Sequence, residues 1–126
     1  MALNVTRPSR FKSYHGHCET DATQVTIYTC PDNCTAYMSL VFITNPTANA
    51  SDIQVRWYDY SESNDDVYII GGKNLASGEY IQLSSAFLVL EAGDTLRATA
   101  DNTAGGNDPH IDIITTVEEV FLPTQG

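Results

Sequence analysis

Three cysteines near the start of the chain are the residues best suited to chemistry. Cys30 and Cys34 flank the short loop 31–33. If the flanking strands pair, the Cα atoms of these two cysteines fall within the range that a disulfide requires. Cys18 then lacks a partner in its own chain and either stays free or pairs with another copy. A disulfide between Cys30 and Cys34 and a set of three free thiols are therefore both open.

A metal site is the third interpretation of the same segment. His15, His17 and Cys18 lie within four positions, and Cys30 and Cys34 follow twelve residues later. Zinc takes four nitrogen or sulfur ligands, and thiolate-rich sets are typical. The spacing is not that of a zinc finger, because the histidines precede the cysteines and three residues separate the cysteine pair. We expect no metal and no other cofactor.

Other combinations of reactive residues give no support for an enzyme. The chain has no Gly-x-Ser-x-Gly turn. Glu118 and Glu119 are neighbours on an expected strand, so their side chains point to opposite faces and cannot act as a carboxylate pair. His110 stands alone in the sequence, and the segment 71–73 lacks the remaining residues of a phosphate loop. We expect a protein without catalytic activity.

Aromatic residues offer a second kind of site. Trp57, Tyr58 and Tyr60 lie within four positions and are able to line a sugar-binding face. Aromatic pairs across strands also stabilise sheets by themselves, and we favour that structural role. A module that binds a host glycan through these three residues and the tip at 102–109 is kept as an alternative.

The basic residues gather near the N-terminus of an acidic chain. The net charge is −10, yet Arg7, Arg10 and Lys12 lie in a segment of 17 residues that contains no Asp or Glu. The acidic remainder repels phosphate, which argues against nucleic acid as a partner. The longest apolar run is too short to cross a membrane. The basic segment predicts docking on an acidic surface, such as a neighbouring copy.

Strands must position all these residues. Between residues 23 and 122, apolar residues alternate or form short blocks, with turn residues about every ten positions, which is typical of a sandwich or barrel. We predict an all-β fold, a two-sheet antiparallel β-sandwich of jelly-roll or immunoglobulin-like type. Residues 1–22 form an extended basic arm, 23–122 the sandwich and 123–126 a tail. The eight expected strands are 23–30, 35–44, 52–60, 66–70, 79–83, 87–90, 95–100 and 110–122.

Alternation within these strands predicts the core. Met38, Leu40 and Phe42 fall on one face of the strand 35–44. The other expected core residues are Val25, Ile27, Ile53, Val55, Trp57, Ile69, Ile81, Leu83, Val89, Leu96, Ile111, Ile113 and Val117.

Two stretches, 66–83 and 88–100, carry a pattern found in one group of proteins. The second stretch contains the hairpin motif Leu-Glu-x-Gly-Asp-x-Leu at residues 90–96. The strand ends Phe42–Asn45 and Val55–Trp57, and the segment Thr116–Val120, also match. Over residues 35–120 the chain resembles small virion structural proteins of tailed bacteriophages, of the marine and cyanobacterial type.

This resemblance implies a role in particle architecture without catalysis. We expect a capsid decoration or cement protein that docks through its N-terminal arm and the sandwich edges. A neck or tail accessory protein is the alternative. The implied partners are major capsid or neck and tail proteins and further copies of the chain, in a homo-oligomer such as a trimer. The expected location is the virion, after assembly in the host cytoplasm.

Overall fold

The computed structural model describes residues 8–102 and 108–122. Within this part of the chain no helix is long and apolar enough to cross a membrane. The described residues form eight strands: β1 (Ser9–Cys18), β2 (Val25–Thr29), β3 (Cys34–Thr44), β4 (Ser51–Asp59), β5 (Asp65–Leu75), β6 (Tyr80–Glu91), β7 (Thr95–Asn102) and β8 (Ile111–Phe121).

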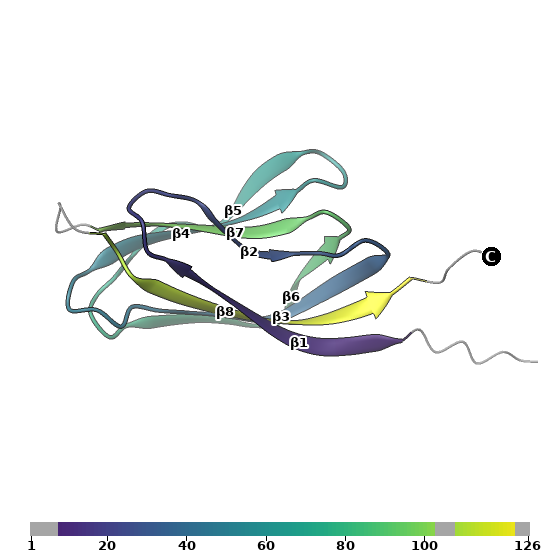
Figure 1. The fold of residues 1–126 in the computed structure, drawn as a ribbon, viewed down its shortest axis with the longest axis horizontal. Helices are drawn as coiled ribbons and strands as arrows, with labels where there is room; N and C mark the ends of the chain where they lie inside the picture. Colours follow the sequence, from purple (N-terminus) through teal and green to yellow (C-terminus); the bar gives the residue numbers. More distant parts are fainter. Residues whose placement is uncertain (1–7, 103–107, 123–126) are drawn as a thin grey trace, which may run out of the picture.

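The strands form two four-stranded layers (Figure 1). The first sheet has the order β1-β8-β3-β6 and the second has the order β2-β7-β4-β5, with antiparallel pairing throughout. The chain crosses between the sheets at every connection except the β4–β5 hairpin. This is the jelly-roll arrangement. The predicted all-β, two-sheet antiparallel sandwich is confirmed, and of the two predicted types the jelly roll is the one observed.

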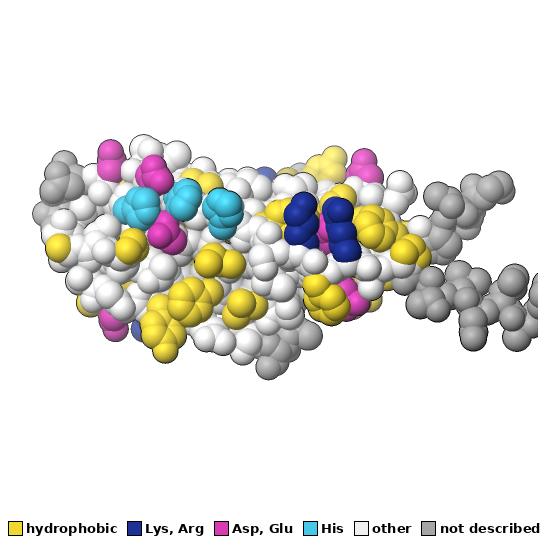
Figure 2. All heavy atoms as spheres, turned by 60° about the horizontal axis from the view of Figure 1, so that its bottom comes forward, with side chains coloured by type: hydrophobic (Ala, Val, Ile, Leu, Met, Phe, Trp, Pro, Cys, Tyr) yellow, Lys and Arg dark blue, Asp and Glu magenta, His cyan; other side chains and the backbone are white. Residues whose placement is uncertain are grey.

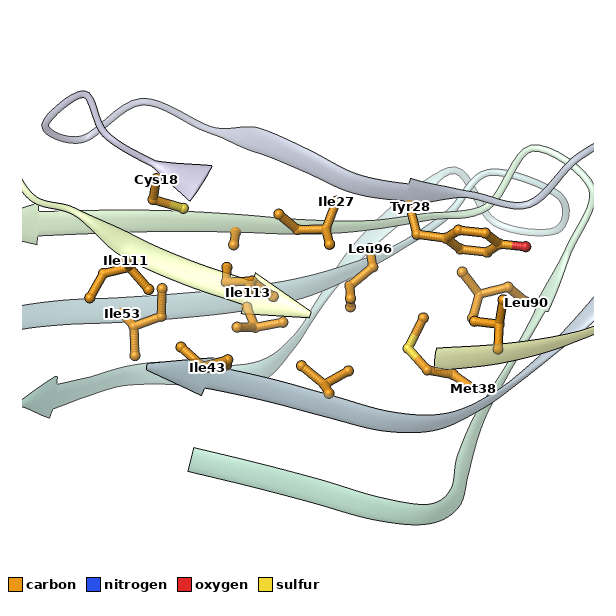
Figure 3. Close-up of a cluster of buried hydrophobic side chains, with 14 of the residues drawn as sticks. Cys18, Ile27, Tyr28, Met38, Ile43, Ile53, Leu90, Leu96, Ile111 and Ile113 are labelled. Atoms are coloured by element: carbon orange, nitrogen blue, oxygen red, sulfur yellow. The ribbon is translucent and has the colours of Figure 1, made fainter. Parts of the chain in front are cut away.

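Apolar side chains from both sheets fill the space between the layers (Figure 3). Full burial of one such side chain contributes about 1.5–3 kcal/mol to the hydrophobic stabilisation. Eight of the predicted core residues are buried, namely Ile27, Met38, Ile53, Val55, Leu96, Ile111, Ile113 and Val117.

Strand β1 corrects the prediction of an extended arm over residues 1–22. Residues 9–18 pair along their whole length with β8, from Ser9 opposite Val120 to Cys18 opposite Ile111. The inner face of β1 also packs against β2 in the other sheet. A Cβ added to Gly16 would lie 2.7 Å from Ile27 Cδ1, so the absence of a side chain lets the layers approach there. The segment 1–7, including Arg7, and the tail 123–126 lie outside the described residues.

A β-bulge in β3 corrects the predicted core face of that strand. Met38 and Leu40 are two positions apart on β3, but their partners on β8, Val117 and Thr116, are consecutive. Ser39 is therefore the extra residue. An extra residue reverses the alternation of a strand. Met38 therefore points into the core, but Val41 and Ile43 replace Leu40 and Phe42 as the buried residues beyond the bulge.

Two other strands are longer than predicted. Gly71 and Gly72 do not end β5; they lie where its register against β4 shifts, and Gly72 takes a positive φ of 142°. The predicted strands 79–83 and 87–90 are parts of the single strand β6. Near its end Leu90 is buried and Val89 is 45% exposed, so Val89 is not a core residue.

Candidate interaction surface

A buried carboxylate fastens β1 to the sandwich. Glu119 on β8 is fully buried. Arg10 Nε donates to its Oε1 at 2.7 Å, Tyr14 OH donates to its Oε2 at 2.9 Å, and Tyr28 OH donates to Oε2 at 2.6 Å. These three donors come from β1 and β2, so one side chain joins strands of both sheets. We call Glu119 with Arg10, Tyr14 and Tyr28 the Glu119 cluster.

The hydrogen bonds of the Glu119 cluster keep the carboxylate ionised. Burial raises the pKa of Glu119, but the hydrogen bonds from Tyr28, Arg10 and Tyr14 and the charge of Arg10 outweigh burial, so its pKa lies below the ordinary value of 4.5. Burial and the bond to Glu119 raise the pKa of Tyr28 far above its ordinary value. The tyrosines therefore remain neutral donors, and β1 is held as a fixed edge of the first sheet.

The outer face of the first sheet is partly apolar. Residues opposite one another in register cross all four strands in the order Phe11, Glu118, Tyr37 and Val89. Phe11 is 71% exposed, Tyr37 42% and Val89 45%. At a strand spacing of about 4.8 Å, such a row spans about 14 Å. We call Phe11, Tyr37 and Val89 the apolar row, in which the charged residue Glu118 separates Phe11 from Tyr37, and Figure 2 shows hydrophobic side chains on this face.

Further apolar residues extend the apolar row on the same face. Ile114 on β8 is 42% exposed and lies opposite the half-buried Phe42 on β3. The ring of Phe42 stacks on exposed Tyr80 with centroids 5.2 Å apart. Exposed apolar residues gathered on one face mark interaction sites on soluble proteins. The sequence prediction missed this face because it placed Phe42 and Val89 in the core.

The predicted basic residues do not share one surface role. Arg10 is bonded to Glu119 of its own chain, although half of its side chain is exposed. Lys12 Nζ lies 5.0 Å from the centre of the Tyr14 ring and its residue is exposed. Arg10 is thus part of the fold, and Lys12 is the described basic residue of this segment that remains available to an acidic partner.

The three aromatic residues of the predicted glycan face do not form one platform. Trp57 and Tyr58 are consecutive on β4 and point to opposite faces. The Tyr58 ring packs on the guanidinium of Arg97 at 4.0 Å, and its hydroxyl bonds Asn64. Tyr60 is exposed, with its ring 6.2 Å from that of Tyr58.

Trp57 lines an open hollow of about 280 Å³ at one end of the sandwich. The other lining residues are mostly acidic or polar: Asp59, Ser61, Glu62, Val89, Glu91 and Asp94. Trp57 Nε1 is buried and has no hydrogen-bond partner among the described residues. Asp94 is occupied by the fold, since its two oxygens accept the backbone N–H groups of Ser61 and Glu91.

All three cysteines are buried free thiols. Burial raises the pKa of Cys18 to about 11 and that of Cys30 to about 12. Cys30 and Cys34 are unbonded to each other in this structure, and the Cys30 thiol contacts the carbonyl oxygen of Cys34 at 3.5 Å. A disulfide between them stays a prediction.

The structure separates the residues of the predicted metal cluster. His17 lies on the outer face of β1 and Cys18 on its inner face. Cys18 pairs with Ile111 at one end of β8, whereas Cys34 pairs with Phe121 at the other. Ten residues of strand span about 33 Å. The cysteines therefore cannot join the histidines around one ion.

The jelly roll is shared with proteins of capsids and pili. No protein-family model matches the chain, and no curated protein sequence matches it. Over 98% of this chain and 96% of the other, the fold matches a protein of Bacillus endospore appendages, described as disulfide-linked pili, with a TM-score of 0.55 and 11% identity. It also matches a protein in the capsid structure of the Helicobacter pylori bacteriophage KHP30 (TM-score 0.53, 13% identity, 94% and 95% coverage). A third match is a protein of turnip yellow mosaic virus (TM-score 0.50, 9% identity, 100% and 87% coverage). At these identities the likeness concerns the fold.

Proposed function

We propose that this protein is a non-enzymatic structural subunit of a bacteriophage particle, and that it acts as a capsid decoration or cement protein. The apolar row on the outer face of the first sheet is the observation that carries the proposal. The fold likeness to a phage capsid protein, a plant virus protein and a pilus protein supports it. Its partners are other virion proteins and further copies of itself, in a homo-oligomer such as a trimer.

The shape of the contact surface fits this role. The apolar row lies on the outer face of the first sheet, whose edge strand β1 is fixed by the Glu119 cluster. A rigid surface loses little conformational entropy when it binds, which favours affinity. Many copies on one particle add avidity to a contact that is weak for each copy. Lys12 and the basic residue Arg7 of segment 1–7 add attraction to an acidic neighbour.

The experiment compares two matched double variants. Tyr37→Ser/Val89→Ser removes two exposed side chains from the apolar row. Val67→Ser/Tyr68→Ser removes an equally exposed Val and a more exposed Tyr from β5 in the other sheet. Light scattering over a range of concentrations measures oligomer formation, and immunoelectron microscopy measures occupancy on virus particles from cells that make the protein.

We expect the apolar-row variant to lose oligomers and particle occupancy while the β5 variant keeps both. Equal behaviour of the two variants would contradict the assignment of this face. Absence of the wild-type protein from purified particles would contradict the virion role itself. A location restricted to the neck or tail would replace the decoration role by that of an accessory protein.

The hollow at Trp57 supports one alternative function, the binding of a host glycan. Trp57, whose buried indole N–H has no partner among the described residues, lines this hollow together with the acidic residues Asp59, Glu62 and Glu91, and sugar hydroxyls bond to both kinds of group. Trp57→Phe keeps an aromatic ring and removes the N–H. Glycan-array binding by the wild type that weakens in Trp57→Phe would favour this function, and absence of wild-type binding would refute it.

A further inference from the structure

All three histidines of the chain meet on one face of the molecule. Figure 2 shows them together, with acidic side chains beside them. His17 Nδ1 lies 2.6 Å from Asp112 Oδ1, and His110 Nε2 lies 2.8 Å from the same oxygen. The ring centroids of His17 and His110 are 5.6 Å apart, and those of His15 and His17 are also 5.6 Å apart.

The strand register explains how these residues meet. His17 on β1 lies directly opposite Asp112 on β8. His110 precedes Asp112 by two positions, and residues two apart on an extended chain share a face. The segment His110-Ile111-Asp112 therefore presents an imidazole and a carboxylate on one side, with buried Ile111 between them on the other.

We infer that His17, His110 and Asp112 bind a late first-row divalent cation such as Zn²⁺. Their three ligand atoms all lie within 4.8 Å of one another. Tetrahedral Zn²⁺ with bonds of about 2.0–2.1 Å holds its ligand atoms about 3.3 Å apart. Small side-chain rotations bridge that difference. The ion takes the place of the protons that the two imidazoles now share with Asp112.

A second carboxylate is placed to support this site. Glu19 Oε1 lies 3.8 Å from His110 Nδ1, the ring nitrogen that does not face Asp112. Imidazoles that bind a metal through one nitrogen usually donate the other N–H to a carboxylate or carbonyl, which orients the ring. Asp112 and Glu19 also bring two negative charges, which balance a dication.

The ligand types determine which cation fits. Two imidazoles and one carboxylate suit Zn²⁺ and its late first-row neighbours, whereas Ca²⁺ and Mg²⁺ prefer sets of oxygen ligands. Three protein ligands leave a fourth position open, as in sites that retain a water molecule. The ion would link β1 to β8 at the end of the strand pair opposite the Glu119 cluster.

The test is calorimetric titration of the tag-free protein with ZnCl₂, and with CaCl₂ for comparison. We expect one Zn²⁺ per chain and no Ca²⁺ binding. His110→Ala and Asp112→Asn should abolish the Zn²⁺ signal, and Glu19→Gln should weaken affinity roughly 10-fold. Glu118→Gln is the matched control, because it removes one carboxylate from the outer face of the same strand about 20 Å away.

The result that overturns the site is Zn²⁺ binding that His110→Ala and Asp112→Asn leave unchanged, or no saturable Zn²⁺ binding to the wild type. A stoichiometry of one ion per two chains would overturn the site within a single chain. Thermal unfolding with and without Zn²⁺ checks that the variants fold. The melting temperature should rise with Zn²⁺ in the wild type and in Glu118→Gln, but not in His110→Ala.

Discussion

Replacing Glu119 by Gln tests how the first strand is held in the fold. The substitution keeps the shape of a side chain that is fully buried but removes its charge. The Gln side chain has one acceptor oxygen for donors that now use two carboxylate oxygens. Its amide group also presents N–H donors where Arg10 and the two tyrosines donate.

The expected loss follows from the two tyrosine bonds. A hydrogen bond to a charged group contributes about 1.5–3 kcal/mol and a neutral one about 1 kcal/mol, so each tyrosine bond loses roughly 1 kcal/mol. The ion pair with Arg10 contributes little more, because half of the Arg10 side chain is exposed and water screens its charge. Glu119→Gln should lower the free energy of unfolding by about 2 kcal/mol, or the melting temperature by about 8 °C.

The effect should depend on pH in a defined direction. The pKa of Glu119 is lowered in the folded protein, so below its ordinary value of 4.5 the unfolded chain takes up a proton first. The stability contributed by the ionised carboxylate is full at neutral pH and is lost as the pH falls through the folded pKa. The free energies of unfolding of the wild type and Glu119→Gln should therefore become more similar below pH 4.5.

Urea unfolding at pH 7 and at pH 3–4 measures both expectations. Glu118→Gln is the control, because it makes the same chemical change one residue away on the outer face, where we expect less than about 0.5 kcal/mol. Hydrogen exchange should show that Glu119→Gln releases the amides of β1 before those of β3. If the two variants are equally stable at pH 7, the Glu119 cluster does not hold β1 and the reasoning fails.

Three further predictions concern positions of close packing. Gly93→Ala should cost about 1–3 kcal/mol, since Gly93 has a φ of +89° and an added Cβ would lie 2.7 Å from Tyr60 Cδ1; Gly78→Ala, at φ +76° with open space, should cost less in the same chemical denaturation assay. Gly16→Ala should lower stability in thermal unfolding by less than about 1 kcal/mol, because the added Cβ would meet only the terminal Cδ1 of Ile27 at 2.7 Å, and the next atoms lie at 3.9 Å; a larger loss would show that the Ile27 side chain cannot move aside. The three buried thiols should react with a disulfide reagent only after denaturation, because burial raises the pKa of each, and rapid reaction of the native protein would show that they are accessible.

The class of fold was predictable because two local features both indicate β-strands over most of the chain. These features are the turn residues and the alternation of apolar with polar residues. The turn before β7 is an example, since Gly is the residue that adopts a positive φ most readily and Gly93 has a φ of 89°. The opposite orientation of Glu118 and Glu119 was also predictable from alternation and is confirmed, with Glu119 buried and Glu118 on the outer face. These features depend on neighbours in the sequence.

The features that were missed depend on residues far apart in the chain. β1 lacks an apolar pattern because its inner face carries Arg10 and Tyr14 toward a buried carboxylate more than 100 positions away. The bulge at Ser39 cannot be recognised from the residue types around it. It nevertheless reverses which of the following residues are buried and which are exposed. His110 stands alone in the sequence because its neighbour in space, His17, reaches it only through the pairing of β1 with β8.

The pairing of β1 with β8 also determines when the protein can finish folding. Ser9 faces Val120, so β1 has no partner strand in its sheet until β8 has been synthesised. During that time the β8 side of β3 is an open strand edge, which is a site for unwanted pairing between chains. Contacts between such distant residues also make the search for the native state slow. Chains that stop before β8 therefore leave β1 without its partner strand and one edge of β3 open to pairing with other chains.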